Sequence, residues 1–244
     1  TPIMYFHGWP GAHFSNSHKS MFNPKKHRVI FYNQRGSGNS TPLGNLNNNT
    51  TQDLISDVDK LREHLKIDRM YLCGGSWGST MALLYAIAQP IRVISMIVWS
   101  VFLAEPTKNH ASYTYTHNNF PEAWERFISF VPKEKQSNWY SIAEYYNQQI
   151  KLNNQESIKY ANEWSLWGNT LINNTQAQSL LELDTIKNAQ DNLSHAKIEL
   201  YYMLNNYFIE ENFILNNIDI IKNIPAYVVH GRFDMCTPAN GAYK

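Results

Sequence analysis

The chain has 244 residues, of which 43% are hydrophobic and 17% are charged, so it is long enough to bury a large core and typical of a globular protein. Its formal net charge of +1 provides no field that favours nucleic acid or an anionic membrane. No apolar run reaches the roughly 18 residues that a membrane span requires. We therefore expect neither a nucleic-acid partner nor a membrane partner.

The first hundred residues alternate between strand patterns and helical patterns. Strands are predicted at Ile3–Phe6, Arg28–Tyr32, Met70–Cys73 and Ile94–Trp99, and helices from Thr50 or Thr51 to about Leu65 and from Ser79 to Ala88. Such alternation is typical of a parallel sheet with helices on both faces.

This alternation stops after residue 103. Aromatic and aliphatic residues then recur at helical spacing, as from Trp124 to Val131, and strand character returns at Ala226–His230. We predict a doubly wound, mostly parallel α/β core formed by residues 1–103 and 219–244, with a helical cap formed by residues 104–218. In such sheets ligands bind at the carboxyl ends of the strands, where the cap would lie.

The segment from Gly74 to Gly78 fits the pattern G-x-S-x-G and lies between a predicted strand and a predicted helix. That context is required for a nucleophile elbow, a strained turn that presents a serine at a helix N-terminus. A glycine-rich turn can also contain a serine by chance. The strand before it and the helix after it favour Ser76 as a catalytic nucleophile.

A second loop, from His7 to Gly11, follows the first strand. In hydrolases with such an elbow, a loop at this place supplies one backbone N–H of the oxyanion hole, and the residue after the nucleophile supplies the other. These donors would be Trp9 and Trp77. The alternative is a plain turn, because the same residues also have good turn chemistry.

Asp234 follows the last predicted strand, in the chain order expected for the acid that orients a catalytic base. No histidine follows it. His230 precedes it at a strand end and is a poor candidate, and His110, His117 and His195 read as polar surface residues of the cap. We therefore expect the catalytic histidine to lie beyond Lys244, in a protein of which this chain is a fragment at both ends.

Two cysteines, Cys73 and Cys236, lie outside any metal-binding spacing. One disulfide between them is possible, but buried thiols in a reducing compartment are favoured, which predicts a cytoplasmic protein. No metal site is predicted.

Several motifs together resemble the proline iminopeptidases: HGWPG at residue 7, NQRGSGNS at 33, GGSWGSTMALLYA at 74, AKIE at 196 and HGRFDMCTP at 230. The resemblance covers essentially the whole chain. It implies an α/β-hydrolase that removes N-terminal proline from peptides through Ser76 and Asp234, without a metal or organic cofactor. It also implies that Glu199 binds the free amino group of the substrate, which suits the attraction between a carboxylate and an ammonium ion.

Three residues depart from the family pattern. Trp9 replaces a glycine, Asn33 replaces an aspartate, and Gly168 stands where the family has a second amine-binding carboxylate. Two other interpretations therefore remain open. One is a serine aminopeptidase or esterase of broader specificity, and the other is an inactive, truncated pseudoenzyme that lacks the catalytic histidine.

Overall fold

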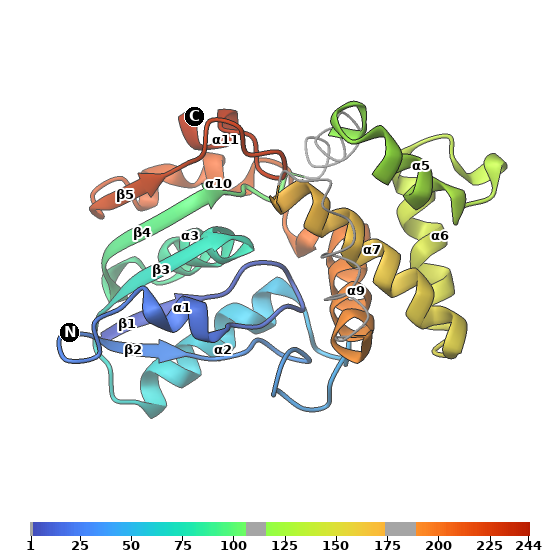
Figure 1. Cartoon of the computed structure of the whole chain (residues 1–244). Helices are drawn as coiled ribbons and strands as arrows, with labels where there is room; N and C mark the ends of the chain where they lie inside the picture. The colour runs from blue at the N-terminus through green and yellow to red at the C-terminus, as the bar shows by residue number, and fades with distance from the viewer. Residues whose placement is uncertain (1, 106–115, 174–188) are drawn as a thin grey trace.

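The computed structural model describes residues 2–105, 116–173 and 189–244. Its sheet has five parallel strands in the order β2-β1-β3-β4-β5, with all carboxyl ends at the same edge (Figure 1). The strands are β1 (Pro2–Phe6), β2 (Arg28–Phe31), β3 (Met70–Ser76), β4 (Val93–Val101) and β5 (Ala226–Val229). The predicted α/β-hydrolase arrangement of a parallel sheet with covering helices is confirmed.

Several helices lie between these strands, and one follows β5. They are α1 (Asn16–Ser20), α2 (Thr51–His64), α3 (Trp77–Ala88), α10 (Phe213–Asn216) and α11 (Asn240–Tyr243), with 3₁₀ turns at Pro90–Arg92, Asn206–Phe208 and Ile218–Ile220. At the start of α2 the Thr50 side chain accepts a hydrogen bond from the Asp53 N–H, and Asp53 bonds back to the Thr50 N–H, which forms a capping box. Trp77 to Ala86 in α3 are all buried, because this helix packs against β1, β3 and β4.

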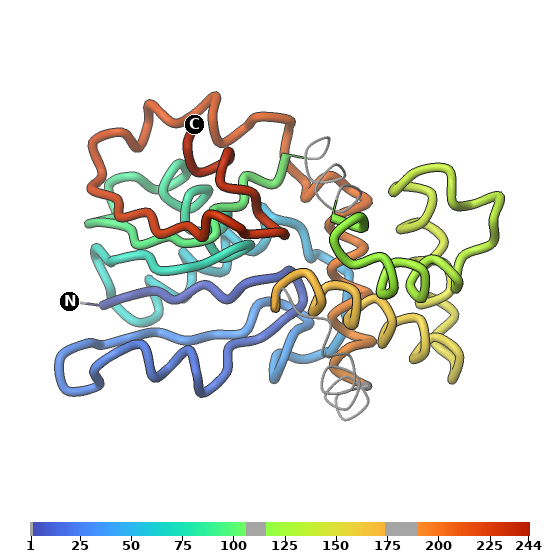
Figure 2. The backbone as a smooth tube through the Cα atoms, turned by 45° about the horizontal axis from the view of Figure 1, so that its top comes forward, coloured from blue at the N-terminus to red at the C-terminus, as the bar shows by residue number. Residues whose placement is uncertain are grey.

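A group of helices stands beyond the carboxyl ends of the strands (Figure 1). Its members are α5 (Pro121–Ser129), α6 (Trp139–Lys151), α7 (Gln155–Asn173) and α9 (Ala189–Leu204), with 3₁₀ turns at Thr116–Asn119 and Lys133–Lys135. Phe127 lies at the centre of this group and stacks on Tyr146 and Trp167, with ring centroids 4.6 and 5.6 Å away. In Figure 2, α7 and α9 lie nearest to the sheet, with α5 and α6 on their outer side. The division into a core and a cap at residues 104 and 218 stays a prediction.

The observed elements differ from the predicted ones mainly at their ends. β3 continues to Ser76 and α3 begins at Trp77, so no loop separates strand from helix at the elbow. The short helix α1 was not predicted, because its sequence NSHKS has no apolar period. Within the described ranges, no helix combines the length and the apolar character needed to cross a bilayer.

Candidate active site

Ser76 stands at the junction of β3 and α3 with φ 54° and ψ −126°, a backbone conformation that is costly for any residue with a side chain. The surrounding glycines leave no room for Cβ atoms. A Cβ on Gly74 would lie 2.5 Å from the Gly78 carbonyl oxygen, and a Cβ on Gly75 would overlap the Trp99 indole. The packing therefore enforces the sharp turn expected of a nucleophile elbow.

Side-chain hydrogen bonds fix the first turn of α3. Ser79 Oγ donates to the Ser76 carbonyl oxygen at 2.6 Å and accepts from the Phe102 N–H at 3.0 Å. In the part of the chain that the structure describes, no histidine is hydrogen-bonded to the Ser76 hydroxyl. The expected base beyond Lys244 stays a prediction.

The loop that begins at His7 runs directly against the elbow. A Cβ on Gly8 would lie only 3.7 Å from the Ser76 Cβ. Trp9 has a φ of 50°, so it holds a left-handed conformation that favours glycine. Trp9, Ser76 and Trp77 line the same small cavity, so the three residues predicted to form the nucleophile and the oxyanion hole are brought together.

Gln34 ties this loop to the elbow. Its backbone N–H donates to His7 Nε2 at 3.2 Å, and its side-chain oxygen accepts from the Trp77 indole N–H at 2.9 Å. The His7 Nδ1–H in turn donates to the Gly8 carbonyl oxygen at 2.9 Å. His7 is fully buried, and burial lowers its pKa to about 4, so its ring is neutral at pH 7.

Glu199 on α9 also lines the cavity, although only 3% of its surface is exposed. Its Oε2 accepts a hydrogen bond from the Trp164 indole N–H at 2.8 Å and lies 3.5 Å from His195 Nε2. The free volume of the cavity is small, about 20 Å³. The structure therefore places the predicted amine-binding carboxylate beside the predicted nucleophile.

His195 was interpreted as a surface residue of the cap, but its side chain is half-buried, with 22% exposed. It lies one helical turn before Glu199, which turns both side chains to the same face of α9, and its ring meets the Trp9 ring edge-on at 5.8 Å. Burial is the main cause that lowers the pKa of His195 to about 4. The His117 ring contacts the Trp124 ring at a tilt, with ring centroids 5.1 Å apart, and His110 lies outside the described residues.

Asp234 lies in a tight turn after β5. Its carboxylate accepts hydrogen bonds from the backbone N–H groups of Cys236 and Thr237, at 3.0 and 2.8 Å, and from the Thr237 hydroxyl at 2.9 Å. Both partner residues line the Ser76 cavity. The turn thus holds Asp234, the acid predicted to orient the catalytic base, next to the cavity. Asp234 itself is not among the residues that line the cavity.

Both ring nitrogens of His230 are occupied by the backbone. Nδ1 accepts from the Val101 N–H at 3.0 Å, and Nε2 donates to the Thr237 carbonyl oxygen at 2.6 Å. The Nε2 atom is 3.9 Å from Asp234 Oδ2. These contacts connect β4 to the turn after β5, which supports a structural role for His230.

Two of the three departures from the family pattern meet in space. A Cβ on Gly168 would lie 3.5 Å from Cη2 and 3.7 Å from Cζ2 of the Trp9 ring. The indole therefore fills the space into which a longer side chain at position 168 would extend. Asn33 instead bonds to the segment before α1, where its Oδ1 accepts from the Phe14 N–H at 3.3 Å.

Sequence reasoning missed some of the cavity wall, namely Phe102, Tyr207, Cys236 and Thr237. Cys73 and Cys236 are both free thiols. Burial, with a smaller contribution from nearby carboxylates, raises the pKa of Cys236 to about 12, so it is not a thiolate nucleophile at neutral pH.

Three aromatic residues of the cap, Trp164, Trp167 and Tyr202, are buried. They lie behind the cavity wall instead of forming it. Tyr202 meets the Trp77 ring edge-on at 5.3 Å and donates a hydrogen bond to Asn49 Oδ1 at 3.0 Å.

Known proteins with similar sequences point to one enzyme family. A family model described as the alpha/beta hydrolase fold matches residues 1–244. The chain is 35% identical to a probable proline iminopeptidase of Leptolyngbya boryana, with 99% of the chain and 75% of that protein covered. It is 34% identical to a proline iminopeptidase of Xylella fastidiosa, with 99% and 77% covered.

Solved structures agree on the fold. A bromoperoxidase from Bacillus anthracis aligns with a TM-score of 0.66 over 99% of this chain and 77% of the other, at 15% identity. An alpha/beta hydrolase enzyme from a Medee basin deep-sea metagenome library aligns with a TM-score of 0.63 over 99% and 75%, at 16% identity. Together with the sequence relatives, these matches show that the chain belongs to the α/β-hydrolase fold family and, within it, to the proline iminopeptidases.

Proposed function

We propose that this protein is a serine exopeptidase that releases N-terminal proline from peptides. The observation that supports this proposal most directly is that Ser76, in its strained elbow, and the buried carboxylate of Glu199 line one cavity. Bond cleavage and recognition of a free amine would therefore take place in the same cavity.

The proposed reaction proceeds through an acyl-enzyme. Ser76 Oγ attacks the carbonyl carbon of the N-terminal proline while its proton passes to the histidine expected beyond Lys244. Asp234 would orient that histidine, and the N–H groups of Trp9 and Trp77 would bind the oxyanion. The proton is returned to the leaving amine of the shortened peptide. Water then attacks the ester, which releases proline and regenerates the serine.

Glu199 would select substrates with a free N-terminus. Its carboxylate is withdrawn from water and held by the Trp164 indole N–H, so it attracts the secondary ammonium group of proline more strongly than an exposed carboxylate would.

A test of this function uses the complete product of the gene. We expect it to hydrolyse the arylamide of proline faster than those of alanine and leucine, and to leave N-acetylproline arylamide uncleaved. Ser76→Ala should abolish turnover. Glu199→Gln should raise KM for proline arylamide more than it lowers kcat, whereas Glu144→Gln, an exposed carboxylate of α6, should change neither.

The contact between Trp9 and Gly168 favours a second candidate, a serine aminopeptidase or esterase of broader specificity. With one of two amine-binding carboxylates replaced by glycine, recognition of the ammonium group rests on Glu199 alone among the residues predicted to bind it. Rapid cleavage of a simple acyl ester, or similar rates for the three arylamides, would favour this candidate. Absence of turnover on every substrate would contradict both and favour the inactive pseudoenzyme.

A further inference from the structure

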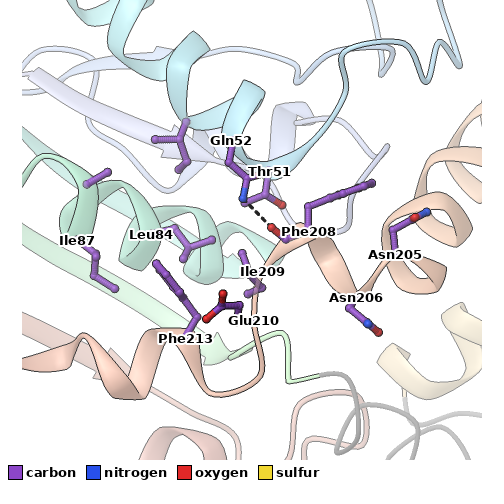
Figure 3. A pocket seen from close by; sticks show the side chains of 12 residues that line it. Thr51, Gln52, Leu84, Ile87, Asn205, Asn206, Phe208, Ile209, Glu210 and Phe213 are labelled. Carbon is purple, nitrogen blue, oxygen red and sulfur yellow. Dashed lines mark hydrogen bonds between the residues drawn. The ribbon is translucent and has the colours of Figure 1, made fainter.

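A second, larger pocket lies on the other side of the segment that contains Tyr207. It is bounded by the start of α2, the end of α3, the 3₁₀ turn Asn206–Phe208 and α10 (Figure 3). Its volume is about 640 Å³, within the range typical of small-molecule sites. The predicted reaction uses none of its residues.

The lining of this pocket combines an apolar wall with a single charge. Ile55, Leu84, Ile87 and Phe213 supply apolar surface, and Glu210 supplies the charge. No lysine, arginine or histidine is among the lining residues, and within the described part of the chain none forms an ion pair with Glu210. Glu210 is exposed, and Figure 3 shows its carboxylate between the side chains of Phe213 and Ile209. This chemistry suits an amine carried on an apolar body.

One wall of the pocket is a strained segment. Asn206, Tyr207 and Phe208 have φ values of 52°, 53° and 56°, so three consecutive residues with side chains adopt the left-handed conformation. This conformation costs about 1 kcal/mol or more for each of Tyr207 and Phe208, and less for Asn206, so it persists only where the surroundings hold it.

Two side chains at the start of α2 hold this segment. Thr51 Oγ1 donates to the Tyr207 carbonyl oxygen at 2.5 Å, and Gln52 Nε2 donates to the Phe208 carbonyl oxygen at 2.6 Å, the bond drawn in Figure 3. Gln52 itself lines the pocket. A ligand that displaces the Gln52 amide or pushes on Phe208 therefore acts on the contacts that keep the segment strained.

The same segment reaches the candidate active site from its other side. The Tyr207 ring packs on Trp77 with centroids 5.8 Å apart and meets the Phe102 ring edge-on at 5.3 Å. Tyr207 also lines the cavity that contains Ser76 and Glu199. Its two neighbours, Asn206 and Phe208, line the second pocket. The two sites are thus separated by one residue of backbone.

We propose that the pocket between α2, α3 and α10 binds a small amine with an apolar body, and that binding shifts the Asn206–Phe208 segment and with it Tyr207 in the Ser76 cavity. The amine would pair with Glu210 while its apolar body covers Leu84, Ile87 and Phe213. Because the ligand contacts the strained segment directly, its binding energy differs between conformations of that segment, which is the condition for coupling two sites.

The test measures binding and does not depend on peptide hydrolysis. The probe is 2-phenylethylamine, and the matched control is 3-phenylpropionate, which carries a similar apolar body with the opposite charge. Dissociation constants are measured by calorimetry for the unaltered protein, for Glu210→Gln and for Ala88→Trp. Ala88 is exposed at the pocket's edge, so the new ring should obstruct the pocket without disturbing the core.

We expect the amine to bind more tightly than the acid, by about fivefold, as for one partly exposed ion pair. Glu210→Gln should remove this preference, and Ala88→Trp should weaken the binding of both molecules. Equal binding of amine and acid, or binding unchanged by Ala88→Trp, would overturn the assignment of the pocket.

The coupling is tested by placing 3-fluorotyrosine at position 207 and, as a control, at position 146, where α6 carries a buried tyrosine. Saturating amine should move the fluorine resonance at 207 and leave that at 146 in place. Binding of the amine without a shift at 207 would overturn the coupling. Because neither measurement involves turnover, failure here is distinct from failure of the proposed peptidase function.

Discussion

The contact between Trp9 and Gly168 leads to a quantitative prediction about the stability of the protein. A Cβ at position 168 would lie in ordinary contact with the indole, 3.5 Å from Cη2, so any atom beyond Cβ that points the same way overlaps the ring. We consider Gly168→Gln, which adds the length of a glutamate without a buried charge. Overpacking costs about 1–3 kcal/mol, while loss of a glycine inside α7 returns about 0.5–1 kcal/mol. The free energy of unfolding should fall by about 1–2 kcal/mol.

The reasoning is tested with a double-mutant cycle by urea denaturation, followed by circular dichroism. Trp9→Gly removes the ring at a residue whose φ of 50° suits glycine. In that background Gly168→Gln should no longer destabilise, which gives a coupling energy of about 1 kcal/mol or more. Gly168→Ala is the control, because its Cβ fits: it should stabilise by about 0.5–1 kcal/mol in both backgrounds. An equal loss from Gly168→Gln with and without the indole would refute the steric explanation.

Three further predictions concern the elbow and the residues around it. Ser76→Gly should raise the free energy of unfolding by about 1 kcal/mol, because it relieves the positive φ, whereas Ser76→Ala should not; equal effects in urea titrations would contradict stored strain. His7 has a pKa of about 4 when folded and about 6.5 when unfolded, so the unfolded chain binds its proton first as the pH falls. Stability should therefore decline between pH 6.5 and 4 by up to about 3 kcal/mol from this residue, and His7→Gln should flatten that part of the curve. Gln34→Leu should destabilise by about 1–3 kcal/mol in thermal or urea unfolding, because it leaves the buried Trp77 indole N–H without its acceptor, and an unchanged midpoint would show that this bond contributes nothing.

Local sequence patterns predicted the sheet and the elbow well because their causes are local. The apolar period of residues 54 to 65 and the cap at Thr50 predicted α2 to within one residue at its C-terminal end. The glycines around Ser76 predicted a sharp turn, since close approach of strand and helix requires residues without a Cβ. The order of Ser76 and Asp234 predicted that the two would belong to one site, and the structure brings the turn of Asp234 to the Ser76 cavity.

The features that escaped prediction arise from contacts between distant segments. Tyr207 enters the cavity because Thr51, 156 residues earlier, holds its carbonyl oxygen. His195 is half-buried because the Trp9 ring, from the loop after β1, packs against it. No pattern within one segment reports such contacts. The helical position of His195, four residues before Glu199, was the one available signal that the two side chains share a face.

The cavity is assembled from two separately encoded parts: Ser76 belongs to the sheet, and Glu199 belongs to a helix outside it. On the proposed function, substitutions on α9 would change which peptide ends are accepted and would leave the serine elbow intact. The reverse also holds, since a small rotation of α9 relative to the strands would alter the gap between carboxylate and hydroxyl without changing either residue. On that proposal, substrate selectivity would depend on how the sheet and α9 are docked as much as on which residues they carry.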